Sequence, residues 1–191
     1  MVKQSTLHIT ISGLLIAFGI VIPMFSPFRI MLEPAASYTL ASHVPVFIAM
    51  FISPFSAIAV AAGTTIGFAL GPYTPVVVFR AASHVVFAAL GALYWQSICR
   101  AGLSAAKVRV FSLAVALTHA VSELIVVSIF YFLIGMGDEF YQKGFLFSVV
   151  LLVGLGTIIH SMIDFEIAYA VKKIKGFDYL TMANKKIKHE D

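Results

Sequence analysis

Charged residues are scarce in this chain of 191 residues. They make up 12% of it, whereas hydrophobic residues make up 60%, and the mean hydropathy is +0.98. In ordinary soluble domains about 25% of the residues are charged, so this balance excludes that class. A transmembrane helix needs roughly 20 residues. We therefore expect a single-domain, all-α integral membrane protein over residues 1–191, with six transmembrane helices and no room for a soluble domain.

Motifs for several chemistries are also missing. The one cysteine, Cys99, excludes an intramolecular disulfide and any multi-cysteine metal or redox site. The chain has no G-x-x-x-x-G-K-[ST] phosphate loop, no H-E-x-x-H zinc motif and no G-x-S-x-G nucleophile motif. We therefore expect no enzymatic activity and no cofactor of its own. Any ATP would be hydrolysed by partner subunits.

The apolar runs place the helices. They predict helices near residues 7–25, 43–53, 55–71, 75–97, 108–134 and 145–172. Only Ser53 and Pro54 separate the second helix from the third, so each is either a short span or half of a hairpin. The stretch 26–42 contains Pro27 and Pro34 and is too broken for a helix. We predict that it forms an ordered outer loop between helices 1 and 2, with a lid as one possible role.

The distribution of lysine and arginine predicts the topology. Cytoplasmic loops carry an excess of basic residues. With six spans, only two basic residues, Arg29 and Lys143, fall on one side of the membrane. The other side holds Lys3, Arg100, Lys107, Arg109 and the basic tail 173–191. Both termini are therefore predicted to be cytoplasmic, and the tail to anchor on lipid headgroups. The net charge of +4 is thus no sign of nucleic-acid binding.

A small set of polar residues interrupts the apolar helices. An ionised side chain in the bilayer interior costs about 2.5–3.5 kcal/mol, and such residues usually mark substrate or ion pathways. Each helix carries its pair at i, i+4, on one face. The pairs are Arg80 with His84, and His119 with Glu123; His43 and the loop residues Tyr38, Tyr73 and Glu33 complete the candidate set. We predict that they form a substrate cavity facing the exterior.

Two other interpretations of these residues stay open. Arg80 and Glu123 could be a buried ion pair that holds two helices together. The imidazole and carboxylate groups also suit zinc, cobalt or nickel, although their spacing follows no metal motif and we predict no bound metal. A further pair, His160 and Asp164, lies on the last helix. We expect it deeper, toward the cytoplasmic end, in helix packing or an inner gate.

The first helix carries a candidate contact surface. Thr10, Gly13 and Ala17 recur at i, i+3 and i+7 and include a small-xxx-small pair. Small residues let another helix approach closely in lipid. This face predicts either a docking site for a partner or internal packing.

Together with the predicted spans, one passage carries a family resemblance. The segment Ser42-His43-Val44-Pro45-Val46-Phe47-Ile48-Ala49-Met50-Phe51-Ile52-Ser53-Pro54 resembles the second span of the substrate-binding S components of energy-coupling factor (ECF) vitamin transporters. The resemblance covers nearly the whole chain and is closest to the niacin-specific members. In that family the first helix carries an Ala-x-x-x-Ala-like contact surface, where Gly13 and Ala17 stand here.

The resemblance implies a function. An S component captures a vitamin from outside and releases it inward when docked on a scaffold membrane subunit with two ATPase subunits. A buried arginine suits a carboxylate through two parallel hydrogen bonds. We therefore expect Arg80 to bind the carboxylate of nicotinic acid, and His84, His43 and Glu123 to bind the ring nitrogen or orient Arg80. Another vitamin, a divalent metal ion and a purely structural role remain the alternatives.

Overall fold

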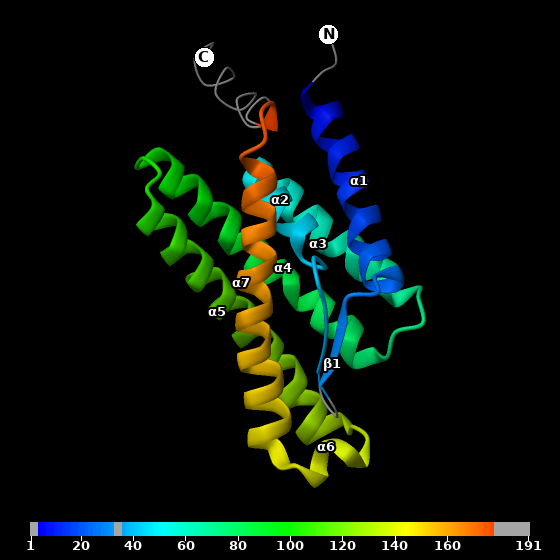
Figure 1. Ribbon diagram of the computed structural model, residues 1–191. Helices are drawn as coiled ribbons and strands as arrows, with labels where there is room; N and C mark the ends of the chain where they lie inside the picture. Colours follow the sequence, from blue (N-terminus) through cyan, green and yellow to red (C-terminus); the bar gives the residue numbers. More distant parts are fainter. Residues whose placement is uncertain (1–3, 33–35, 178–191) are drawn as a thin grey trace.

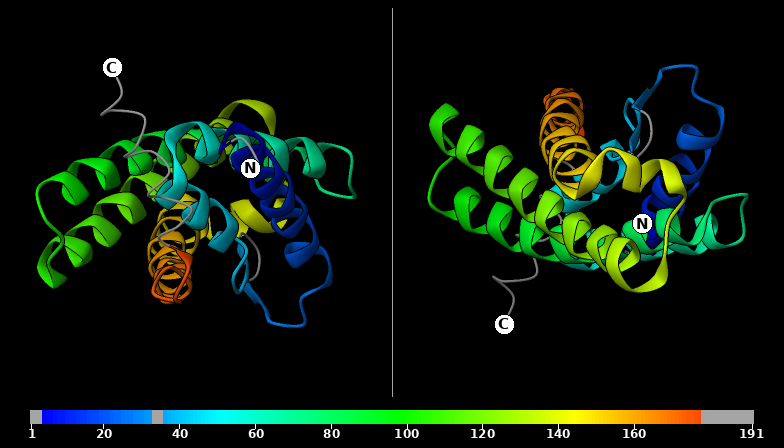
Figure 2. Two further views of the ribbon diagram at one scale, coloured as in Figure 1. Left: turned by 90° about the horizontal axis from the view of Figure 1, so that it is seen from above. Right: turned by 90° about the horizontal axis from the view of Figure 1, so that it is seen from below.

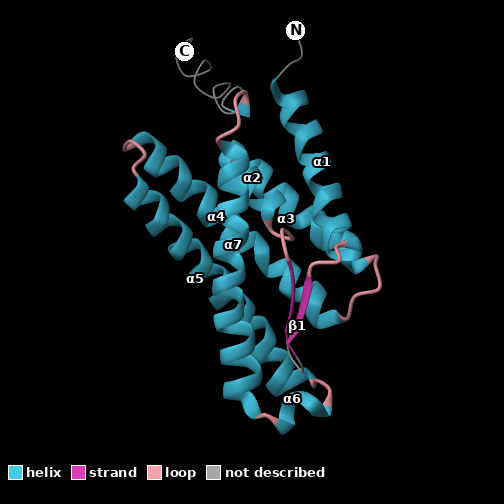
Figure 3. Ribbon diagram, in the orientation of Figure 1, coloured by secondary structure: helices cyan, strands magenta, loops and turns pink. Residues whose placement is uncertain are grey.

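The computed structural model describes residues 4–32 and 36–177 (Figure 1). Helices dominate these residues, and the all-α membrane class is confirmed in its main features (Figure 3). The helical elements are α1 (Gln4–Phe25), α2 (Val44–Ile52), α3 (Pro54–Ala69), α4 (Pro75–Arg100), α5 (Ala105–Ile129), the π-helical η1 (Phe130–Ile134), α6 (Asp138–Gln142), the π-helical η2 (Leu146–Leu155) and α7 (Gly156–Lys172). The predicted tail from residue 178 onward and Lys3 lie outside the described residues.

The helices alternate in direction. α1, α3 and α5 run away from the end at which α1 begins, and α2, α4 and α7 run back toward it (Figure 1). The loop between α4 and α5 and the end of α7 consequently lie toward one end, and α6 lies at the other. Seen along this direction, α4 and α5 lie side by side and extend away from α1 (Figure 2). Arg100, Lys107 and Lys172 thus share one end of the described structure.

Four helical stretches are long and apolar enough to cross a membrane. They are Thr6–Phe25, Pro75–Arg100, Ala105–Ile134 and Leu146–Lys172. α3 is shorter, with 16 residues, and α2 has only 9. At 1.5 Å per residue, α2 rises about 14 Å, less than half of a hydrocarbon core of roughly 30 Å. α2 therefore crosses only part of the membrane.

A β-hairpin occupies most of the stretch predicted to be an ordered loop. β1 (Arg29–Leu32) pairs antiparallel with β2 (Ala36–Thr39) in the register Arg29↔Thr39 and Ile30↔Tyr38. The hairpin connects the end of α1 to α2 and extends toward the end of the molecule at which α6 lies (Figure 3). Its strands hydrogen-bond each other, so their backbone groups are satisfied where no helix forms. The loop prediction missed this pairing because its four-residue strands are too short to show a clear period.

Proline and serine define the helix starts. Ser53 caps α3 by accepting a hydrogen bond from Ser56 N at 3.0 Å, and Pro54 is the first residue of that helix. A proline at this position loses no helical hydrogen bond. Ser104 caps α5 in the same way, through Lys107 N. These caps turn the chain sharply and set α3 against α2 and α5 against α4.

Aromatic side chains fill the core between α2 and helices α4, α5 and α7. Phe47, Phe51, Trp95, Phe111 and Phe165 contact one another with ring centres 4.6–6.1 Å apart. All five are buried, whereas leucines such as Leu90, Leu117 and Leu151 are about half exposed. Exposed leucines on α1, α4, α5 and η2 suit contact with lipid chains. The aromatic core fills the end of the molecule that carries the basic residues, and the polar residues lie beyond it.

Candidate functional site

A cavity of about 180 Å³ opens between the hairpin and helices α1 to α5. Typical pockets for drug-sized ligands measure roughly 300–1,000 Å³, so this one suits a small molecule. Its walls combine charged, hydroxyl and aromatic groups. The lining residues are Gly19, Pro23, Arg29, Ser37, Thr39, Ser42, His43, Val46, Thr64, Phe68, Tyr73, Val77, Arg80, Ala81, His84 and Glu123.

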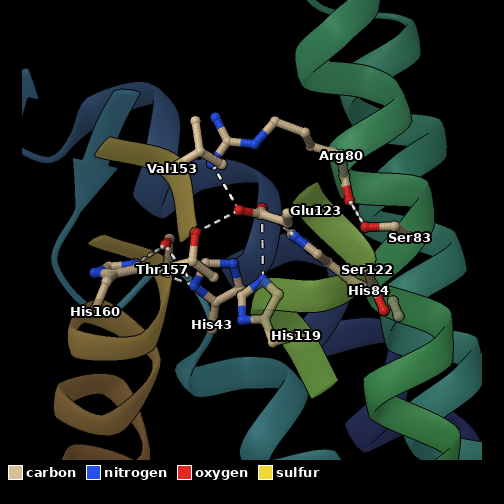
Figure 4. Close-up of polar contacts among 12 residues, drawn as sticks. His43, Arg80, Ser83, His84, His119, Ser122, Glu123, Val153, Thr157 and His160 are labelled. Atoms are coloured by element: carbon tan, nitrogen blue, oxygen red, sulfur yellow. Dashed lines mark hydrogen bonds and ion pairs between the residues drawn. The ribbon is translucent and has the colours of Figure 1, made fainter. Parts of the chain in front are cut away.

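Glu123 is the centre of the polar network (Figure 4). Its Oε2 accepts hydrogen bonds from Arg80 Nη2 at 2.8 Å and from Thr157 Oγ1 at 2.6 Å. Its Oε1 lies 3.2 Å from Nε2 of His84. Glu123 is 3% exposed, and a buried carboxylate needs such partners to stay charged. The i, i+4 pairs predicted on α4 and α5 therefore face each other.

Arg80 keeps unused hydrogen-bonding capacity. One Nη binds Glu123, but the buried Nε has no hydrogen-bond partner among the described residues. Arg29 lines the same cavity and binds Thr39 Oγ1 through Nε at 3.3 Å and the carbonyl of Pro23 through Nη2. Two arginines against one glutamate give the cavity a net positive charge when its histidines are neutral. The cavity is therefore suited to an anion.

His119 belongs to the network but not to the cavity wall. It is fully buried, its Nε2 lies 3.5 Å from Oε1 of Glu123, and its ring stacks on Phe87 with centres 4.2 Å apart. Neither of its ring nitrogens has a hydrogen-bond partner in the described structure. His119 contacts the rings of His43 and His84, which line the cavity, but is not itself among the lining residues.

His160 and Asp164 lie next to His43, not in a separate inner site. His43 Nδ1 is 3.1 Å from His160 Nε2 and 3.3 Å from Asp164 Oδ2. The sequence predicted a deeper position for this pair, in helix packing or an inner gate, because depth was judged along one helix. In the structure the pair contacts His43, a residue of the cavity wall. The turn that follows the hairpin places His43 beside α7.

The predicted loop residues behave differently from one another. Tyr73 lines the cavity and stacks on Phe68 with ring centres 4.3 Å apart. Tyr38 instead donates to the carbonyls of Leu152 and Val153, at 2.7 and 3.1 Å, and is not a lining residue. Burial raises the pKa of the Tyr38 phenol, which therefore stays protonated and donates. Glu33 lies outside the described residues.

Two contributors escaped prediction from the sequence. Arg29 was assigned only to the outer charge balance, and Thr157 was not considered. Pairing of Arg29 with Thr39 in the hairpin register turns the arginine toward the cavity, and no sequence signal marks a strand of four residues. Nothing in the sequence around Thr157 distinguishes it from the other threonines of the predicted helices. Only the packing of α7 against α5 brings it to Glu123.

The candidate docking face of α1 is exposed. Thr10, Gly13 and Ala17 all lie on the surface of the described structure, and a Cβ added at Gly13 would meet no atom within 4 Å. The small residues Ala57 and Ala61 of α3 are buried and serve internal packing. Exposure fits a contact surface, but small residues alone do not identify a partner.

Fold and cavity together define a class. A multi-pass helical membrane protein whose few charged residues converge on a small cavity is typical of membrane proteins that bind or move small solutes. No protein-family profile matches the chain, and no solved structure matches it significantly. The niacin transporter NiaX of Lactococcus lactis subsp. cremoris (strain MG1363) is 36% identical over 172 residues, which cover 90% of this chain and 76% of the relative. The chain therefore belongs to the family of this transporter, and the predicted membership among the S components of ECF transporters is confirmed.

Proposed function

We propose that this chain binds nicotinic acid from outside the cell as the substrate-binding subunit of an ECF importer. The unused hydrogen-bonding capacity of Arg80, facing a small cavity of net positive charge, carries the proposal. The name of its relative, a niacin transporter, supports the choice of vitamin. The proposal assigns no reaction to the chain itself and leaves ATP hydrolysis to two partner subunits.

The carboxylate of nicotinic acid would bind to the arginines. Arg80 is already aligned by Glu123 at 2.8 Å, so its planar guanidinium is held before the ligand arrives. Arg29, which also lines the cavity, adds a second positive charge. Charge-assisted hydrogen bonds are about twice as strong as neutral ones. An amide in place of the carboxylate would therefore bind much more weakly.

The pyridine ring would be held by aromatic and imidazole groups. Tyr73 and Phe68 offer a stacked aromatic wall, and aromatic pairs contribute about 0.5–1.5 kcal/mol beyond their buried area. His43 and His84 also line the cavity and offer ring nitrogens to the pyridine. Glu123 would orient Arg80 and His84, since its oxygens are already engaged.

The side from which the ligand enters follows from charge. The hairpin residues Arg29, Ser37 and Thr39 line the cavity, and the hairpin extends toward the end opposite to the α4–α5 loop (Figure 1). The end of α4, the start of α5 and the end of α7 lie at the same end as this loop and carry Arg100, Lys107 and Lys172, respectively. Under the positive-inside rule the basic end is cytoplasmic. The cavity would then open outward, and six helical segments would leave both termini inside.

The test is calorimetric titration of the detergent-purified chain with nicotinate, nicotinamide, isonicotinate and benzoate. We expect one nicotinate per chain, with nicotinamide at least about tenfold weaker, since a charge-assisted bond contributes roughly 1.5–3 kcal/mol. Isonicotinate, with its nitrogen moved around the ring, and benzoate, without a ring nitrogen, should also bind more weakly. Equal binding of nicotinate and nicotinamide would refute the carboxylate assignment.

Variants test whether the two arginines of the cavity bind nicotinate through specific contacts or only through the overall charge of the protein. Arg80→Lys keeps the charge opposite Glu123 but loses the planar fork, so the fold should survive while nicotinate affinity falls at least about tenfold. Arg29→Gln should weaken binding independently. Arg109→Ala removes an exposed arginine of α5 outside the cavity and should leave the affinity within twofold.

A further inference from the structure

Three histidines from separate elements converge at the floor of the cavity (Figure 4). His43 precedes α2, His84 lies on α4 and His119 on α5. Their ring centres form a nearly equilateral triangle with sides of 4.8, 4.7 and 4.8 Å. One ring nitrogen of each lies within 4.8 Å of those of the other two. We propose that these three histidines bind a divalent transition-metal ion.

Carboxylates contact all three rings from the outside. Asp164 Oδ2 lies 3.3 Å from Nδ1 of His43, and Glu123 Oε1 lies 3.2 Å from Nε2 of His84 and 3.5 Å from Nε2 of His119. Histidines that ligate metals donate their other ring N–H to a carboxylate or carbonyl. The contacts of His43 and His84 match this arrangement, and His119 lies at a longer distance from its carboxylate. The opposite nitrogens, Nε2 of His43 and Nδ1 of His84 and His119, are then the ligands.

A buried nitrogen without a partner supports the assignment. Neither ring nitrogen of His119 has a hydrogen-bond partner among the described residues, although the side chain is 0% exposed. Leaving a buried polar atom unpaired is unfavourable. A cation bound by neutral imidazoles would satisfy Nδ1, one of these unpaired nitrogens.

The three imidazole ligands restrict which metal ions would bind. Three imidazoles suit Zn²⁺, Co²⁺, Ni²⁺ or Cu²⁺ and not Mg²⁺ or Ca²⁺, which prefer oxygen ligands. Three protein ligands leave one tetrahedral position open. His43 and His84 line the cavity and His119 does not, so the open position faces the cavity. A pyridine nitrogen could coordinate there, a step that rests on the proposed function, whereas the metal site itself does not.

The neighbouring group of His43, His160 and Asp164 is a weaker candidate. Its donor atoms also lie within 4.8 Å of one another. Both oxygens of Asp164, however, already accept backbone hydrogen bonds at 2.8 Å, from Ala41 N and His43 N. The proposal departs from the sequence-based expectation of no metal, because ligands from three separate elements leave no motif in the sequence.

The test uses the full chain, purified through a histidine-free tag and treated with a chelator. Zn²⁺ is titrated by calorimetry, and Co²⁺ by visible absorption, which distinguishes tetrahedral coordination. We expect one ion per chain and a tetrahedral Co²⁺ spectrum. Absence of stoichiometric binding by the unmodified chain would overturn the proposal without any variant.

Variants locate the ion. His119→Gln keeps an amide donor toward Glu123 but removes Nδ1, and should weaken Zn²⁺ binding at least about tenfold. His84→Gln should do the same. His160→Gln, in the same network, and His8→Gln, on α1, should leave the affinity within about threefold. Unchanged binding in His119→Gln, or its loss only in His160→Gln, would contradict the assignment.

Two further measurements keep the outcome clear. The thermal unfolding temperature of the metal-free His119→Gln chain should stay close to that of the metal-free parent, which separates a lost ligand from a lost fold. Nicotinate titrations are run with and without chelator. Zn²⁺ binding without any nicotinate binding would uphold the metal site and refute the proposed function. Nicotinate binding by a chain that binds no Zn²⁺ would do the reverse.

Discussion

Asp164 of α7 accepts hydrogen bonds from the backbone N–H groups of Ala41 and His43, one on each carboxylate oxygen and each 2.8 Å long. This pair of contacts joins the end of the hairpin to the last helix, across more than 120 residues of sequence. Asp164 is fully buried. The connection holds His43 in position at the floor of the cavity.

Removing this carboxylate should destabilise the fold. Asp164→Ala leaves two backbone donors without an acceptor, and each unpaired buried donor costs about 1–3 kcal/mol. We expect a clear drop in the thermal unfolding temperature in detergent, and a smaller drop for Asp164→Asn, which keeps one acceptor. Glu166→Ala, at an exposed acid of the same helix, is the control. Equal unfolding temperatures for the Asp164→Ala and Glu166→Ala chains would disprove the role.

Ala41 has a positive φ of 69°, in the left-handed region. Glycine adopts this conformation without steric cost, whereas β-branched residues strongly resist it. Ala41→Gly should therefore leave stability nearly unchanged. Ala41→Val should lower it by about 1–3 kcal/mol. Thermal unfolding of both variants is the measurement, and a valine variant as stable as the parent would show that the turn can relax.

The hydroxyl of Thr157 should contribute to stability through Glu123. Thr157→Val keeps the shape but removes a 2.6 Å hydrogen bond to a buried carboxylate, and hydrogen bonds to charged groups contribute about 1.5–3 kcal/mol. Thr157→Ser should retain most of it. In the control, Thr118→Val, the lost hydroxyl bonds only to the carbonyl of Ala114 in its own helix, and its effect should be small. The hypothesis fails if both valine variants unfold alike.

Substitutions of the two tyrosines should affect different properties, stability for Tyr38 and nicotinate affinity for Tyr73. Tyr38→Phe loses hydrogen bonds to the carbonyls of η2, so it should lower stability by about 0.5–1.5 kcal/mol and leave nicotinate affinity within twofold. Tyr73→Ala removes an aromatic wall of the cavity and should weaken nicotinate binding several-fold. Calorimetry and thermal unfolding of both variants check the pair. Weaker nicotinate binding by the Tyr38→Phe chain would show that Tyr38 contributes to the binding site.

Docking on the transport module should depend on the exposed face of α1. A Cβ at Gly13 meets open space, so Gly13→Leu together with Ala17→Leu should not disturb the fold. We expect the double variant to bind nicotinate normally but to lose co-purification with the scaffold and ATPase subunits. Ala82→Leu, at an exposed alanine of α4, is the control. Normal assembly of the double variant would place the contact elsewhere.

The sequence by itself determined the membrane class, the approximate positions of the helices and the pairing of polar residues on each helix. These features follow from local properties. Hydropathy decides which segments enter the bilayer, and the helical period places Arg80 with His84 and His119 with Glu123 on common faces. The passage from Ser42 to Pro54, together with the predicted spans, also indicated the family that the NiaX relative confirms.

Only the tertiary structure decided which polar residues meet. The hairpin register directs Arg29 into the cavity and Tyr38 away from it, and the packing of α7 brings His160, Asp164 and Thr157 to residues far away in sequence. The convergence of three histidines depends in the same way on how α2, α4 and α5 pack. These contacts depend on the relative placement of separate elements, which packing and hydrogen-bond satisfaction set for the whole molecule at once and which no local pattern contains.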